Sequence, residues 1–126
     1  MGTFYAAITL ENPREPELKP VAMNALVDTG TMYLCIPEHV AVQLKLETLY
    51  QREVTLADGS KRVCPYVGPV HVHFNDRGCF TGALVLGDQP LLGAIAMEDM
   101  DLVLIPQLRT IGPNPLSPNI ASGLAK

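Results

Sequence analysis

The sequence predicts a small, mainly antiparallel β domain with one or two short helices. Three observations indicate this class. The 11 prolines and 10 glycines divide the 126 residues into short segments. Most of these segments alternate apolar and polar residues or are rich in β-branched residues. The length suits one domain, and 48% apolar residues are enough to fill its core. We expect a domain over residues 1–112 and a proline-rich arm, extended or disordered, over residues 113–126.

The first third of the chain favours three strands and a helix. The extended segments are Thr3–Leu10, Leu18–Val27 and Met32–Ile36. Asn12–Glu17 is polar and contains two prolines, so it is expected to be a turn. Pro37 suits the first turn of a helix, because its missing N–H has no helical partner there. We expect this helix to end near Lys45.

Two hairpins are predicted in the middle of the chain. The first has Asp58-Gly59 at its tip, a strong signal for a two-residue turn because both residues tolerate positive φ. The second turns at Asn75–Gly78. The strands that flank these two turns are expected over Arg52–Ala57 and Lys61–Cys64, and over Val67–Phe74 and Cys79–Leu86.

The last elements follow a turn at Gly87–Pro90. Leu91–Met97 is apolar and is expected to be a strand followed by a short helix. Leu102–Ile105 has the composition of a buried strand, and Arg109–Ile111 is a candidate for another.

Charge and cysteine content exclude several classes of function. The net charge is −4, and no stripe of Lys or Arg indicates nucleic-acid binding. No apolar run approaches the roughly 18 residues of a membrane span, and the first residues do not resemble a signal peptide. The three cysteines lack CxxC spacing, which favours reduced thiols and a cytoplasmic location.

One short motif carries the functional argument. Asp28-Thr29-Gly30 follows the apolar end of a predicted strand and precedes a hydroxyl residue, Thr31. Alone it is a weak signal, since three common residues match often by chance. Further along come Leu91-Leu92-Gly93, two large apolar residues and a glycine that open a short helix. Between the two lies the hairpin with Ala57-Asp58-Gly59-Ser60 at its tip.

This order of motifs resembles the retropepsin-like (clan AA) aspartic proteases, in particular the single-domain bacterial relatives of the retroviral enzymes. The resemblance covers roughly residues 3–111. It implies an acid-protease barrel, closed and mostly antiparallel. Asp28-Thr29-Gly30 matches the catalytic triplet of that family. The hairpin tip, residues 57–60, matches its flap, and residues 91–93 match the element that packs beside the catalytic loop.

The resemblance implies peptide-bond hydrolysis by an activated water. Two carboxylates hold that water and share one proton, because both cannot ionise at close range. This chain supplies one such motif, so the second carboxylate is expected from Asp28 of another copy across a two-fold axis. In the family the hydroxyl at the position of Thr29 bonds across the dimer. The glycine at the position of Gly30 lets its N–H approach the aspartate. The expected partners are a second copy and an extended peptide or protein substrate, with no metal and no organic cofactor.

The sequence departs from the retroviral members at two positions. Thr31 and Ala94 stand where those enzymes usually have Ala and Arg. Thr31 instead resembles the pepsin-type motif, and its hydroxyl is expected to donate to the outer oxygen of Asp28. Since that bond favours the ionised form, we expect an acidic optimum for activity. The prolines after Ile111 remove strand donors, so this dimer is expected to be held differently from the retroviral ones.

Other candidate sites are weaker. His71 and His73 lie on one face of a predicted strand, but two ligands do not make a metal site, and we expect solvent-facing residues. The acidic residues Glu98, Asp99 and Asp101 lack the spacing of a calcium loop. A cysteine nucleophile has no supporting context, so core packing is expected for the thiols.

A second function stays open. The same fold could be a catalytically silent module that binds a peptide or assembles with a partner, since a fold does not define an activity. The sequence identifies neither the substrate nor the cleavage specificity.

Overall fold

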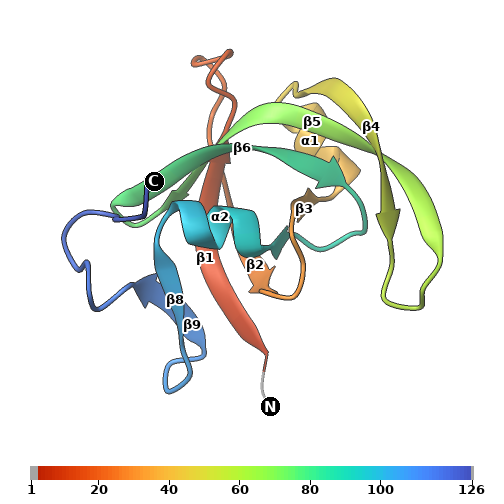
Figure 1. Ribbon diagram of the computed structural model, residues 1–126. Helices are drawn as coiled ribbons and strands as arrows, with labels where there is room; N and C mark the ends of the chain where they lie inside the picture. Colours follow the sequence, from red (N-terminus) through yellow and green to blue (C-terminus); the bar gives the residue numbers. More distant parts are fainter. Residues whose placement is uncertain (1–2, 126) are drawn as a thin grey trace.

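The computed structural model describes residues 3–125 as a β barrel with two short helices (Figure 1). The strands are β1 (Phe4–Glu11), β2 (Val21–Val27), β3 (Leu34–Ile36), β4 (Glu47–Thr55), β5 (Lys61–Phe74), β6 (Arg77–Val85), β7 (Leu91–Leu92), β8 (Leu102–Ile105) and β9 (Thr110–Pro113). The helices are α1 (Glu38–Gln43) and α2 (Ala94–Asp99).

Six strands close the barrel. The main sheet has the order β1-β2-β7-β3-β6-β5-β4, and β5 also pairs with β1. The closing ladder is short, with Thr9 opposite His73, Leu10 opposite Val72 and Glu11 opposite His71. Because β5 bonds to both β6 and β1, the sheet returns to its first strand and β4 remains outside the closed circuit. The predicted closed, mostly antiparallel barrel with short helices is confirmed.

Two ladders run parallel within this mostly antiparallel sheet. β7 pairs parallel with β2, and β3 pairs parallel with β6. Parallel partners need a crossover connection, and here the segments between the paired strands provide it. Alternation of residue types cannot reveal these ladders, because it reports which face is buried and not which strand is the neighbour.

The strand β5 is longer than the sequence predicts. The segments 61–64 and 67–74 were expected as separate strands, and they form one strand of 14 residues. Its register shifts between Val67 and Val70, at the Gly68–Pro69 pair. A bulge bends a strand without ending it, so β5 contributes first to the β4–β5 hairpin and then to the barrel wall.

The main core fills the barrel with side chains from alternate strand positions. In β1, Ala6, Ile8 and Leu10 point inward and are at most 2% exposed. The two helices add buried residues, among them Val40 of α1 and Met97 of α2. Pro37 is the N-cap of α1 rather than its first residue. Burial of this apolar surface is the main stabilising contribution to the fold.

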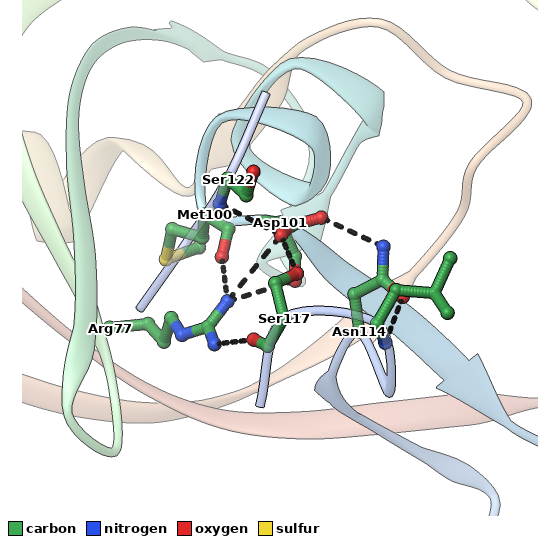
Figure 2. A network of polar contacts seen from close by, with 7 residues as sticks. Arg77, Met100, Asp101, Asn114, Ser117 and Ser122 are labelled. Atoms are coloured by element: carbon green, nitrogen blue, oxygen red, sulfur yellow. Dashed lines mark hydrogen bonds and ion pairs between the residues drawn. The ribbon is translucent and has the colours of Figure 1, made fainter. Parts of the chain in front are cut away.

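Residues 114–125 contain no helix or strand, and three of them are hydrogen-bonded to Arg77 of β6 or to Asp101, which lies between α2 and β8 (Figure 2). Asp101 accepts from Asn114, from Ser117 and from the backbone N–H of Ser122. The Arg77 guanidinium donates to the carbonyl oxygen of Ser117. Lys126 of the expected arm, and residues 1–2 of the expected domain, lie outside the described residues.

Neither helix within residues 3–125 is long and apolar enough to cross a membrane.

Candidate active site

Asp28 lies at the first position after β2, where the strand turns. Its backbone N–H donates to the carbonyl of Leu92 at 3.0 Å, which continues the parallel β2–β7 ladder by one bond. The N–H of Thr31 then donates to the carbonyl of Asp28 at 3.2 Å and closes a turn. The preceding residue, Val27, is buried. Packing in the core thus fixes the end of β2, and the turn places the Asp28 carboxyl group outside the core.

The Asp28 carboxylate is exposed and receives two hydrogen bonds from its own turn. The N–H of Gly30 donates to Oδ1 at 3.0 Å, and the hydroxyl of Thr31 donates to Oδ2 at 3.0 Å. A Cβ at position 30 would lie 3.3 Å from Oδ1, so glycine allows this close approach. Thr29 is exposed in the same turn. Both oxygens are therefore oriented while the carboxylate still faces solvent.

The segment Leu91–Gly93 packs against this turn and against the end of β2. Leu91 and Leu92 pair with Leu26 and Val27 at the end of β2. At the start of α2, the N–H of Ala94 donates to the carbonyl of Thr31 at 2.7 Å. A Cβ on Gly93 would lie 2.5 Å from the carbonyl oxygen of Tyr33 and 2.6 Å from that of Thr31. Only glycine fits between α2 and the turn without moving backbone atoms.

The β4–β5 hairpin is present, but its predicted two-residue turn is wrong. The last paired residues are Thr55 and Lys61, and the N–H of Leu56 bonds to the carbonyl of Ser60 at 2.8 Å. Gly59 has φ +86°, whereas Asp58 has no positive φ. Asp58 instead accepts from both the hydroxyl and the N–H of Ser60. These bonds, the hydroxyl bond first, lower the pKa of Asp58 below its ordinary value. The loop therefore needs more than two residues.

Aromatic side chains anchor the base of this hairpin. The Arg52 guanidinium lies 4.5 Å from the centroid of the Tyr66 ring and bonds to the Tyr33 hydroxyl at 3.4 Å. The Tyr33 and Tyr66 rings meet edge to face at 6.0 Å. A Cβ on Gly82 would lie 2.2 Å from the Tyr66 ring. The hairpin, which extends at the right of Figure 1, is thus tied to the loop before β3.

A cleft of about 410 Å³ lies between the hairpin and the turn. Most of its lining is apolar, and Glu53 is the carboxylate among the lining residues. The lining residues are Gly30, Thr31, Met32, Tyr33, Cys35, Glu53, Val54, Thr55, Leu56, Ala57, Leu84, Leu86 and Leu91.

The structure brings some of the sequence-predicted residues together and leaves others outside the cleft. Gly30, Thr31, Ala57 and Leu91 line it. Asp28 does not line the cleft, but its carboxylate is hydrogen-bonded to Gly30 and Thr31, and both of these residues do. Of the remaining predicted residues, Leu92 and Gly93 are buried behind the turn, and Thr29, Asp58, Gly59 and Ser60 are exposed outside the cleft.

The cysteines do not provide a nucleophile in this arrangement. All three are free thiols and buried. Burial raises the pKa of Cys35 and that of Cys79 to about 11. Since the thiolate is the reactive form, these side chains behave as apolar core residues, as the sequence suggested.

Sequence reasoning missed two groups of residues. Tyr33, Arg52 and Tyr66 gave no motif, because the three come from separate segments. His71 and His73 do share one face, but their neighbour Glu11 belongs to β1 and becomes adjacent only when the barrel closes. The spacing of the two histidines was the only signal in the sequence.

Comparison with known proteins supports the fold. No protein-family model and no curated protein sequence matches the chain. Among solved structures, it is similar to the retroviral protease-like domain of Ddi1 from Leishmania major, with a TM-score of 0.62 and 11% identity. The alignment covers 91% of this chain and 90% of that one. The chain therefore has a retropepsin-like fold, and the expectation of a bacterial-type, single-domain relative stays a prediction.

Proposed function

We propose that this chain is an aspartic endopeptidase that acts as a homodimer, with Asp28 of each copy in the active site. The observation that carries the proposal is the Asp28 carboxylate, which is exposed at the end of a core strand and oriented by Gly30 and Thr31. It stands beside an apolar cleft under a hairpin, in a fold similar to a retroviral protease-like domain.

The proposed chemistry uses one water and one shared proton. The ionised carboxylate of the pair accepts a proton from the water while the water oxygen attacks the scissile carbonyl carbon. The protonated carboxyl donates a hydrogen bond to the carbonyl oxygen, which gains negative charge. Proton transfer to the amide nitrogen then allows the C–N bond to break, and the pair again holds one proton. The Gly30 and Thr31 bonds keep both oxygens oriented for these transfers.

The surroundings of the turn support a partner subunit. Apolar side chains are exposed at this end of the barrel: Met32 is 55% and Ile95 40% exposed, and the N–H of Ile95 bonds to the carbonyl of Met32. Tyr5 is 38% exposed, and its N–H bonds to the carbonyl of Arg109, which follows the exposed Leu108. Apolar groups gathered around a functional loop are typical of protein interfaces.

The cleft supports a substrate with a large apolar side chain next to the scissile bond. Val54 and Leu56 of the hairpin and Leu84 of β6 are among its walls. An extended peptide would lie between the hairpin and the turn, and its backbone would bond to strand edges.

The test is cleavage of a peptide library at pH 4–6 by the purified chain, with the products identified by mass spectrometry. We expect cuts beside large apolar residues and none with Asp28→Asn. Sedimentation of the same samples should show a dimer. Cleavage that survives the substitution would remove Asp28 from the mechanism.

A mixing experiment tests the shared active site. Excess Asp28→Asn chain should inhibit the wild-type chain by forming mixed dimers with one carboxylate. Excess Asp76→Asn chain is the matched control, because Asp76 lies in the exposed β5–β6 turn. If the wild-type chain keeps its full activity in the presence of excess Asp28→Asn chain, a dimeric site is contradicted.

A further inference from the structure

Three side chains with metal-binding atoms meet where β1 and β5 close the barrel. The Oε1 atom of Glu11 lies 3.1 Å from Nδ1 of His71 and 2.6 Å from Nε2 of His73. All three ligand atoms lie within 4.8 Å of one another. The side chains are 24–37% exposed, so solvent can enter while much of each group is shielded. The hydrogen bond from His73 is also the main reason why the pKa of Glu11 is lowered.

The backbone holds these residues in place. Glu11 is directly opposite His71 in the β1–β5 ladder, and His73 is two positions further along β5, on the same face. The His71 ring stacks on Phe80 with centroids 4.2 Å apart, and the two imidazoles lie 3.9 Å apart. A Cβ on Gly78 would lie 3.3 Å from Nε2 of His71, so glycine there leaves room for the ring.

The distances suit a tetrahedral cation. Bonds of about 2.0–2.1 Å to nitrogen or oxygen place neighbouring ligand atoms about 3.3 Å apart around Zn²⁺. The Glu11–His71 separation is close to this value, and the Glu11–His73 separation needs a small opening that rotation of the glutamate side chain can supply. Each imidazole would carry its proton on the other ring nitrogen when it coordinates.

The cluster is separate from the proposed active site. Phe4, at the beginning of β1, is opposite Val27, the residue before Asp28. Glu11 is the last residue of the same strand. Seven residues of extended chain span about 23 Å, so the two sites lie at opposite ends of β1.

We propose that Glu11, His71 and His73 form a binding site for a divalent transition-metal cation of the Zn²⁺ type, with solvent as the fourth ligand. Two imidazoles and one carboxylate form a donor set that binds such ions in preference to Mg²⁺ or Ca²⁺, which prefer oxygen ligands. The cation would join β1 to β5 across a closing ladder of only three residue pairs. It therefore stabilises the closed barrel, independently of Asp28.

The test is calorimetric titration of the tag-free full chain with Zn²⁺, together with thermal unfolding in Zn²⁺, Mg²⁺ or EDTA. We expect one equivalent of Zn²⁺ to bind and to raise the Tm, because an ion that binds only the folded state stabilises it. Mg²⁺ should leave the Tm at its EDTA value. His73→Asn and Glu11→Gln should weaken Zn²⁺ binding by at least about tenfold.

The matched control is His39→Asn, which removes the exposed histidine of α1 and should bind Zn²⁺ like wild type. NMR spectra of the wild-type imidazoles give a second measurement that needs no variant: the His71 and His73 signals should shift with Zn²⁺ while that of His39 stays. No binding of Zn²⁺, or binding that follows His39 rather than His71 and His73, would overturn the proposal.

Discussion

Two aspartates of this chain have opposite surroundings. Both follow a regular element and accept hydrogen bonds from a hydroxyl group and a backbone N–H. Asp28 receives its bonds from Gly30 and Thr31, within its own turn, and is exposed. Asp101 receives bonds from Asn114, Ser117 and Ser122, and its side chain is only 14% exposed.

The Asp101 carboxylate is bonded on both oxygens by residues of the C-terminal arm (Figure 2). The neighbouring Arg77, 5% exposed, donates to the backbone carbonyls of Met100, Asp101 and Ser117. A carboxylate that is satisfied in this way stabilises a structure, whereas an oriented and exposed one is available for chemistry. The difference lies in the partners and not in the residue type.

The largest expected effect is on the activity proposed for Asp28. Asp28→Asn should lower kcat/KM by at least about 10³-fold, because the amide cannot take a proton from water. The free energy of unfolding should stay near the wild-type value, since the side chain is exposed. Peptide cleavage assays and urea unfolding measure the two quantities. A large loss of stability would mean that Asp28 resembles Asp101 after all.

Removal of the Arg77 guanidinium should have the largest effect on stability. Arg77→Met should lower the free energy of unfolding by about 2–3 kcal/mol, because buried carbonyl oxygens lose their donor. Arg62→Met on the exposed part of β5 is the control and should change it by less than about 0.5 kcal/mol. Equal midpoints in urea for both variants would show that the network in Figure 2 contributes little.

Removal of the Thr31 hydroxyl should have a moderate effect on kcat/KM. Thr31→Val keeps the shape and removes the bond to Oδ2 of Asp28, so kcat/KM should fall by about tenfold, the loss of one oriented hydrogen bond. Thr31→Ser retains the hydroxyl and should stay close to wild type. If Val and Ser variants cleave peptide equally well, the hydroxyl does not orient the carboxylate.

The smallest expected effect is the response of the arm to pH. The Ser117 hydroxyl bond, followed by the Ser122 and Asn114 bonds, holds the pKa of Asp101 below its ordinary value of 3.8. A lowered pKa in the folded state means that this contribution to stability is complete above the unfolded pKa. It is lost as the pH falls below about 4 and approaches the folded pKa.

The Ser122 amide should therefore be protected from hydrogen exchange at pH 5–7. Its protection factor, the ratio of the intrinsic to the observed exchange rate, should fall below about pH 4. Asp101→Asn should show weak protection over the whole range. Strong protection at low pH in the wild-type chain would contradict the role given to the carboxylate.

The turn at Asp28 is the part of the candidate site that was predicted best. Its two hydrogen bonds join residues only two and three positions apart, so they depend on local residue type and order. The prediction of these bonds, like the placement of Leu91–Gly93 next to the turn, came from the family resemblance. The structure supplies the reason for that placement, because backbone carbonyls of the turn occupy the space that a Cβ on Gly93 would need.

The fold class followed from alternating residues and the turn-forming residues between them, since these patterns act over a few neighbouring positions. By itself the sequence thus determined a mainly β chain, its two hairpins and a carboxylate in a tight turn. Only the tertiary structure decided the contacts between distant segments. Glu11 and His73 are 62 positions apart, and Arg77 and Ser117 are 40 apart. Such pairs depend on which strands become neighbours and in what register, and that choice is made by closure of the barrel around its core.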